Sequence, residues 1–255
     1  MKLRGSCHPI PRHRRLILDV CRSSLGVPSF PIDRVMRLKK VVEARHDHNA
    51  KSENRIGWVT IFLRSYAIVC KEIPELRSLY FCMPWPRLYE HPHTVASIPI
   101  HRPDDTGVER LIWARICNCE TSSLYEIQRQ MNDAVYKPLR EVYRDGLRME
   151  QVPGWIRRLS WWLGMNWKPR QRAKKVGTFS ISTLAGEDVS NYGHPLVVTS
   201  SLSYTRCNAQ GECTVTLIAD HRVLDGMLAA RSLKRLEEVM NTIVVNELQC
   251  SHPEP

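Results

Sequence analysis

The segment A-D-H-R-V-L-D-G, from Ala219 to Gly226, joins two regular patterns of different kinds. The run 213–219 before it is rich in β-forming residues. After it, apolar residues recur near helical spacing at Leu228, Leu233, Leu236, Met240 and Ile243. The segment therefore predicts a strand, a short loop that carries His221, and a helix.

His221 is the candidate functional residue of this loop. A histidine at the end of a strand can project into a cleft, and its pKa near ~6.5 lets it accept a proton at neutral pH. Asp225 can cap the following helix or form an ion pair, and Gly226 removes a side chain where a backbone or a substrate comes close. The alternative is a hydrogen-bonded core histidine beside an ordinary helix cap, and the spacing leaves both interpretations open.

The rest of the chain mixes helices and strands. A turn, N-A-Q-G-E, separates the β-rich runs 197–204 and 213–219 and predicts a hairpin with Gly211 at positive φ. Helices are expected over 35–47, over 58–73, and from the capping box of Ser123 and Glu126 to about residue 149, with a possible kink at Pro138. Residues 27–36 read as an extended edge segment, and T-V-A-S-I-P-I and L-I-W-A-R-I-C as strands. With no visible linker, we expect one α/β domain over residues 1–255.

Composition narrows the class of protein. Apolar residues make up 43% of the chain, and no segment approaches the ~18 consecutive apolar residues of a membrane span. There is no secretory signal, and nine scattered cysteines favour reduced thiols in a cytoplasm. The net charge of +11 favours an anionic partner such as a phosphorylated cofactor, a nucleic acid or a membrane surface.

Metal and nucleic-acid sites are not expected. The pairs Cys117/Cys119 and His91/His93 have C-x-C and H-x-H spacing, which is not that of a usual zinc site. The glycines form no phosphate-binding fingerprint, and no nucleic-acid-binding module is apparent.

Four blocks of sequence resemble one family. D-H-R-V-L-D-G followed by A-A-R-S-L-K-R-L-E is similar to the C-terminal signature of the catalytic domain of 2-oxo acid dehydrogenase acyltransferases, whose H-x-x-x-D-G motif is matched by His221, Asp225 and Gly226. G-T-F-S-I-S-T-L-A-G (177–186), R-R-L-I-L-D-V-C-R-S-S-L-G-V-P-S-F (14–30) and P-E-L-R (74–77) resemble three further family blocks. The resemblance spans about residues 10 to 247 and implies the two-layer chloramphenicol acetyltransferase-like fold, with a mixed β-sheet and flanking helices.

The resemblance also implies a chemistry. The family transfers acyl groups between coenzyme A and a thiol or hydroxyl, so His221 would be the general base and Ser182 would hydrogen-bond the oxyanion. Asp225 would pair with an arginine of the first helix, where Arg14 aligns and Arg15 is its neighbour. The family forms trimers with active sites at the interfaces, which implies a homotrimer or a higher oligomer. Coenzyme A enters as a substrate, and the sequence does not indicate the residues that contact it.

The chain also departs from the family. Thr183 stands where the family has asparagine, and Ala185 precedes the glycine of this block. Ser182 and His221 are only 39 positions apart, which predicts a trimmed loop. The 255 residues hold neither a lipoyl domain nor a subunit-binding domain, which favours a free-standing acyltransferase with an unknown acceptor, and leaves a catalytically idle scaffold as the alternative.

One segment suggests a further partner. Residues 152–175 carry four tryptophans, seven basic residues and no acid. A helix there could contact a membrane surface through Trp155 and Trp162, or it could pack on its own domain or on a neighbouring subunit.

Overall fold

A computed structural model describes residues 6–187, 189 and 191–250. The predicted hairpin is present: β7 (Ser200–Tyr204) pairs antiparallel with β8 (Glu212–Asp220). Gly211 closes the turn with a φ of 78°, and a Cβ there would lie 2.6 Å from the Cα of Lys39. A side chain at this position would therefore both strain the turn and clash with the start of the helix that begins at Lys39.

The hairpin forms part of a six-stranded sheet. Its order is β1-β8-β7-β6-β4-β5, with β1 (Ser29–Arg37), β6 (Phe179–Ile181), β4 (Val95–Pro103) and β5 (Glu109–Cys117). The short β6 pairs parallel with both neighbours, whereas the other pairs are antiparallel, so the sheet is mixed as expected. A separate pair, β2 (Ser78–Phe81) and β3 (Arg87–Glu90), follows the turn η2 (Pro74–Arg77).

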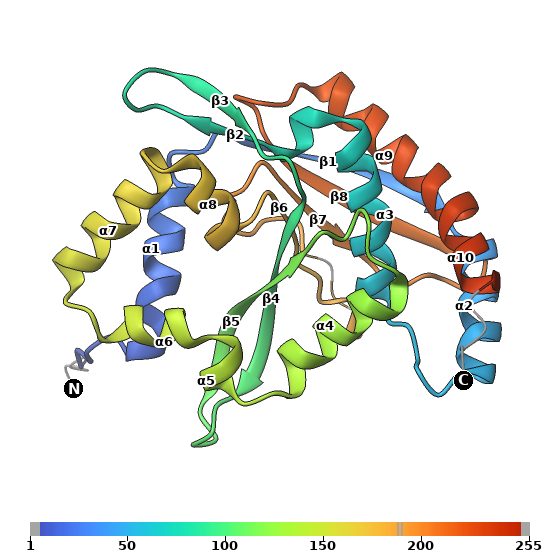
Figure 1. The fold of residues 1–255 in the computed structure, drawn as a ribbon, viewed down its shortest axis with the longest axis horizontal. Helices are drawn as coiled ribbons and strands as arrows, with labels where there is room; N and C mark the ends of the chain where they lie inside the picture. Colours follow the sequence, from blue (N-terminus) through green and yellow to red (C-terminus); the bar gives the residue numbers. More distant parts are fainter. Residues whose placement is uncertain (1–5, 188, 190, 251–255) are drawn as a thin grey trace, which may run out of the picture.

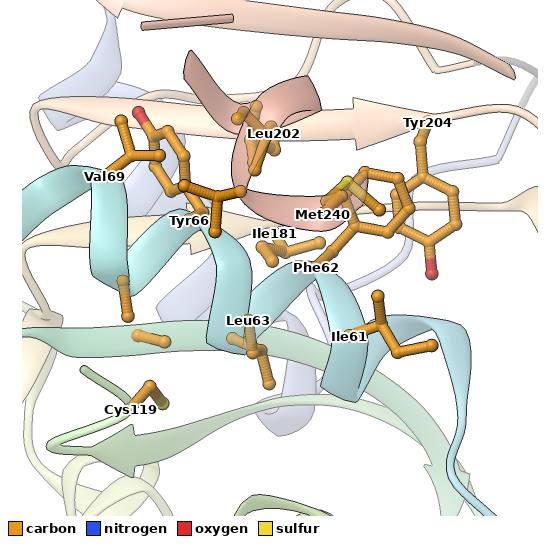
Figure 2. Close-up of a cluster of buried hydrophobic side chains, with 14 of the residues drawn as sticks. Ile61, Phe62, Leu63, Tyr66, Val69, Cys119, Ile181, Leu202, Tyr204 and Met240 are labelled. Atoms are coloured by element: carbon orange, nitrogen blue, oxygen red, sulfur yellow. The ribbon is translucent and has the colours of Figure 1, made fainter. Parts of the chain in front are cut away.

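One face of the sheet holds the main core. Five elements gather on this side in Figure 1: α2 (Lys39–Lys51), α3 (Trp58–Glu72), α4 (Leu124–Tyr136), α9 (Gly226–Val239) and α10 (Val245–Cys250), the last two joined through η4 (Met240–Val244). Figure 2 shows α3 side chains packed toward the strands, where Phe62 stacks on Tyr204 with ring centroids 4.0 Å apart. The hydroxyl of Tyr66 donates to Ser200 Oγ at 2.8 Å, so this buried polar group is satisfied.

The other face carries a second set of helices. These are α1 (Arg15–Ser24), after the turn η1 (Arg12–Arg14), then α5 (Leu139–Val142), α6 (Arg144–Gln151), α7 (Gly154–Asn166) and α8 (Pro169–Val176). They lie beside the β4–β5 end of the sheet (Figure 1). None of the helices in the described ranges is long and apolar enough to span a membrane.

Two sequence predictions need correction. The extended segment runs on to Arg37, so the expected helix over 35–47 begins only at Lys39, because main-chain pairing with β8 holds the residues before it. The long helix after Ser123 is three helices: α4 ends at Tyr136, and Pro138, which lacks a backbone N–H, separates it from α5 and α6. Ser123 caps α4 as expected, with Glu126 N donating to Ser123 Oγ at 3.2 Å.

Candidate active site

His221 lies directly after β8. Its backbone N–H donates to Pro28 O at 2.9 Å, which fixes the loop against the residues that precede β1. The ring packs on Phe30 with centroids 4.6 Å apart, and its Nδ1 lies 3.0 Å from Leu224 O. Because a carbonyl oxygen only accepts, Nδ1 must carry the proton, which leaves the lone pair on Nε2 of an exposed ring.

Arg222 holds the same loop from the other side. It binds the buried Asp220 with two contacts, Nε to Oδ1 at 2.8 Å and Nη2 to Oδ2 at 2.7 Å. Its Nη1 donates to Gly26 O at 3.3 Å, and its guanidinium lies 4.4 Å from the ring centroid of Tyr80. The histidine is thus positioned by a bidentate ion pair that also reaches the end of α1.

Asp225 takes one of its two expected roles, that of helix cap, and Gly226 lacks the close contact expected of it. Asp225 Oδ1 accepts from Leu228 N at 2.7 Å and caps α9. Within the part of the chain that the structure describes, no ion pair joins this exposed carboxylate to Arg14. Arg14 is exposed, and Arg15 Nη1 instead donates to Glu150 O at 3.5 Å. The expected Arg14–Asp225 pair is therefore wrong for the single chain. In the same chain a Cβ at Gly226 would meet no atom within 4 Å, so no intrachain contact requires a glycine there.

Ser182 follows the last residue of β6. Its N–H donates to Leu202 O at 2.9 Å, and its Oγ accepts from Asn191 Nδ2 at 3.3 Å. The block that contains it begins at Gly177, whose φ is 107° and where a Cβ would lie 2.9 Å from Val95 O. The first glycine of the block is thus required by the close approach of β4.

Ser182 and His221 do not meet within one chain. Sheet pairing places Ser182 level with Thr216, five residues before His221 and two strands away. At ~3.3 Å per residue and ~4.8 Å between strands, the separation is about 16 Å along the strands and about 10 Å across them.

A cavity of about 550 Å³ opens beside Ser182. Its floor consists of side chains on the β4, β5 and β6 face opposite the main core, and α1, α6, α7 and α8 form its walls. His194 also lines it, and its Nε2 lies 2.5 Å from Ser201 Oγ, which is in turn 2.5 Å from Ser180 Oγ. Burial lowers the pKa of His194, so the ring is neutral at pH 7. No periodic pattern of residues indicates His194, since it stands in an irregular segment.

The helix α7 closes one side of this cavity. The buried Arg157 Nε binds Asp19 Oδ2 of α1 at 2.5 Å, and Trp161 Nε1 donates to Ser23 Oγ at 2.6 Å. The helix therefore packs on its own domain, which was one of the expected alternatives. Trp155 and Trp162 remain 71% and 47% exposed, so none of the elements described for this chain covers the outer face of α7.

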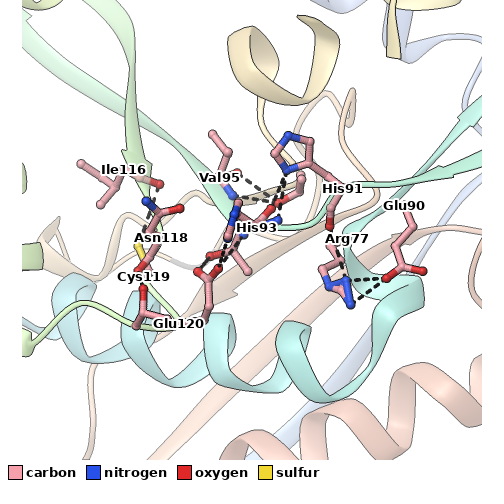
Figure 3. A network of polar contacts seen from close by, with 12 residues as sticks. Arg77, Glu90, His91, His93, Val95, Ile116, Asn118, Cys119 and Glu120 are labelled. Atoms are coloured by element: carbon pink, nitrogen blue, oxygen red, sulfur yellow. Dashed lines mark hydrogen bonds and ion pairs between the residues drawn. The ribbon is translucent and has the colours of Figure 1, made fainter. Parts of the chain in front are cut away.

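A second polar cluster contains the paired histidines and Cys119. His93 Nδ1 lies 3.4 Å from Glu120 Oε1, and His91 Nδ1 lies 2.7 Å from His93 O (Figure 3). Glu120 also accepts from the N–H and the hydroxyl of Thr94, while the buried Cys119 thiol is directed at a backbone oxygen. Among the described residues no group of three such side chains could hold a metal ion, so these contacts serve to tie β4 to the end of β5.

Solved structures share this fold. The dihydrolipoamide acetyltransferase of Azotobacter vinelandii matches with a TM-score of 0.70 and 18% identity, over 94% of this chain and 94% of that chain. The cubic core of a pyruvate dehydrogenase multienzyme complex gives 0.68 and 18%, over 94% of each chain. A chloramphenicol acetyltransferase gives 0.50 and 13%, over 91% of this chain and 96% of that chain.

No family model and no curated protein matches the sequence. The structural similarity confirms the fold that the sequence blocks predicted: this chain has the chloramphenicol acetyltransferase-like fold in the form found in dihydrolipoamide acetyltransferase cores.

Proposed function

We propose that this protein is an acyltransferase that moves an acyl group between coenzyme A and a thiol or hydroxyl acceptor. The observation that carries the proposal is the His221 ring, exposed after β8 with Nδ1 bound to Leu224 O and Nε2 left to accept a proton. The fold is shared with acetyltransferases, and the study of the Azotobacter enzyme concerns a serine, a histidine and an asparagine four positions after the histidine in its catalytic mechanism. His221 and Asp225 have the same spacing.

The proposed reaction is direct transfer in a ternary complex. His221 Nε2 removes the proton of the acceptor, whose sulfur or oxygen attacks the thioester carbonyl and forms a tetrahedral oxyanion. The Ser182 hydroxyl donates to that oxyanion, and its Oγ is already oriented by Asn191. Collapse breaks the carbon–sulfur bond, the acyl group stays on the acceptor, and the coenzyme A thiolate takes the proton back from His221.

This reaction requires two copies of the chain. Because Ser182 and His221 are far apart in one copy, we infer that each site takes its serine from one subunit and its histidine from the next. A trimer, or a larger assembly built from trimers, provides such heterologous contacts. The open space beside Gly226 and the exposed Asp225 are compatible with the approach of a second copy.

The outer face of α7 is the second surface for which we infer a partner. Trp155 and Trp162 are exposed on a helix whose flanks are basic, which suits peripheral contact with an anionic membrane surface.

The first test is release of the coenzyme A thiol from acyl-CoA in the presence of dihydrolipoamide, small alcohols or amines. We expect release that depends on the acceptor and that falls by about 10²–10⁴-fold in His221→Ala, the usual contribution of a general base. His46→Ala is the matched control, because this exposed histidine lies in α2, outside the proposed site, and its ring pairs with its neighbour Asp47. Equal release by wild type and His221→Ala would refute the role of His221, and absence of both release and coenzyme A binding would favour the idle scaffold.

The second test mixes two inactive variants. In an equimolar mixture of His221→Ala and Ser182→Ala chains that assemble at random, roughly a quarter of the interfaces combine an intact histidine with an intact serine. We therefore expect the mixture to recover roughly a quarter of wild-type activity after co-refolding. If each chain formed its own site, the mixture would be no more active than the single variants.

A further inference from the structure

The cavity beside Ser182 is much larger than an acetyl group requires. Its volume of about 550 Å³ falls within the ~300–1,000 Å³ range of small-molecule pockets. Most of its lining is apolar, including Leu16 and Val20 of α1, Trp113 of β5 and Leu159 of α7.

The serine hydroxyls on the cavity floor already have hydrogen-bond partners. Ser180, Ser201 and His194 are joined by two contacts of 2.5 Å, and the hydroxyl of Ser182 has Asn191 as its partner. Among the buried side-chain atoms of the described lining residues, His194 Nδ1 and Arg172 Nε lack a hydrogen-bond partner, but both are buried away from the cavity surface. An apolar ligand can therefore enter without breaking the hydrogen bonds of the serine hydroxyls.

The inner face of α7 keeps the space open. This helix presents Gly164 and Ser160 to the cavity beside Trp161. A Cβ added at Gly164 would meet nothing within 4 Å, so the glycine borders open volume and not packed atoms. A glycine inside a helix costs about 1 kcal/mol relative to alanine, and here its smallness preserves room in the cavity.

The entrance combines apolar and basic groups. Ile156 and Leu159 line the cavity and are 39% and 52% exposed, which marks the apolar edge of its mouth. Arg115, Lys168 and Lys175 also line it and are exposed, against a single exposed acid, Asp145. Such an entrance suits an apolar chain whose head or carrier is anionic.

We propose that this cavity binds an acyl chain of medium to long length, with its reacting carbonyl at Ser182 and its anionic carrier at the basic mouth. The inference rests on the proposed function and specifies its substrate class: a fatty acyl thioester and not an acetyl thioester. No bond forms or breaks in this step, which is recognition only.

The test compares dodecanoyl-CoA with acetyl-CoA, first by calorimetric binding and then as donors to dihydrolipoamide. Burial of apolar surface contributes about fourfold in affinity per methylene, so we expect dodecanoyl-CoA to bind at least roughly 100-fold more tightly than acetyl-CoA. Gly164→Phe fills the open volume and should reduce this ratio to below roughly tenfold. Gly154→Phe, at the first turn of the same helix and outside the cavity lining, should keep the wild-type ratio.

The outcomes separate the two proposals. A binding preference that Gly164→Phe removes, together with no transfer to any acceptor, would support the pocket and refute the proposed function. Transfer without a preference for chain length, or a preference that persists in Gly164→Phe, would refute the pocket and leave the proposed function standing. Gly164→Ala checks folding, because alanine at this open helical position should raise the melting temperature slightly.

Discussion

Substitution of Arg157 by methionine should destabilise the protein through the contact between α7 and α1. The Arg157 and Asp19 side chains are 5% and 2% exposed, and Arg157 Nε binds Asp19 Oδ2. Methionine retains much of the apolar stem but leaves a buried carboxylate without its cation. Asp19 Oδ1 already has no hydrogen-bond partner in the described structure, so nothing nearby compensates.

Removal of one partner of a buried ion pair costs about 3–5 kcal/mol, a large share of a total stability of about 5–15 kcal/mol. For a chain of this size each kcal/mol lowers the melting temperature by about 2–4 °C, so the expected decrease is about 6–20 °C. The double variant Asp19→Leu/Arg157→Leu removes both charges and should return to within about 1 kcal/mol of wild type, because the desolvation penalty disappears with the pair.

The assay is urea unfolding followed by tryptophan fluorescence, since four of the seven tryptophans lie in or beside α7. Arg158→Met is the matched control, because Arg158 is exposed on the same helix and should change stability by less than about 0.5 kcal/mol. A loss below about 1 kcal/mol for Arg157→Met, or a double variant as unstable as the single one, would refute the reasoning.

Three further predictions concern the site and the surface. Ser182→Ala should lower the transfer rate by about 10²–10³-fold with unchanged circular dichroism, and a loss below about threefold would remove Ser182 from the oxyanion site. Burial lowers the pKa of His194 from 6.5, so as the pH falls through 6.5 the unfolded chain takes up a proton before the folded one, and the free energy of unfolding decreases. His194→Gln should flatten that decrease between pH 7.5 and 5.5 in urea titrations. If the free energy of unfolding depended on pH equally in both proteins, the lowered pKa of His194 would be contradicted. Trp155→Ser/Trp162→Ser should weaken co-sedimentation with anionic vesicles by roughly tenfold, while Trp85→Ser, exposed on the β2–β3 pair, should not. If the wild-type protein does not bind vesicles and the double variant dissociates into monomers, this face is instead a contact between subunits.

Local sequence predicted the elements that local chemistry determines. The turn at Gly211, the hairpin of β7 and β8, the helix cap at Asp225 and the loop that carries His221 are encoded within a few residues of each other. The helix cap at Ser123 and the edge strand β1 with its Pro31 follow from the same short-range rules. Boundaries were less predictable, because main-chain pairing with β8 extended β1 into residues whose pattern was helical.

The sequence by itself determined the fold, through blocks whose spacing and residue types resemble a known catalytic domain, and it determined which histidine ends the strand. Only the tertiary structure decided that Ser182 and His221 stand apart in one chain, because strand order and register depend on pairing between distant segments. The same holds for the ion pair that binds α7 to α1 and for the cavity beneath that helix. Such features arise where elements remote in sequence come together, and the energy that fixes them is that of long-range packing and burial, which no local pattern records.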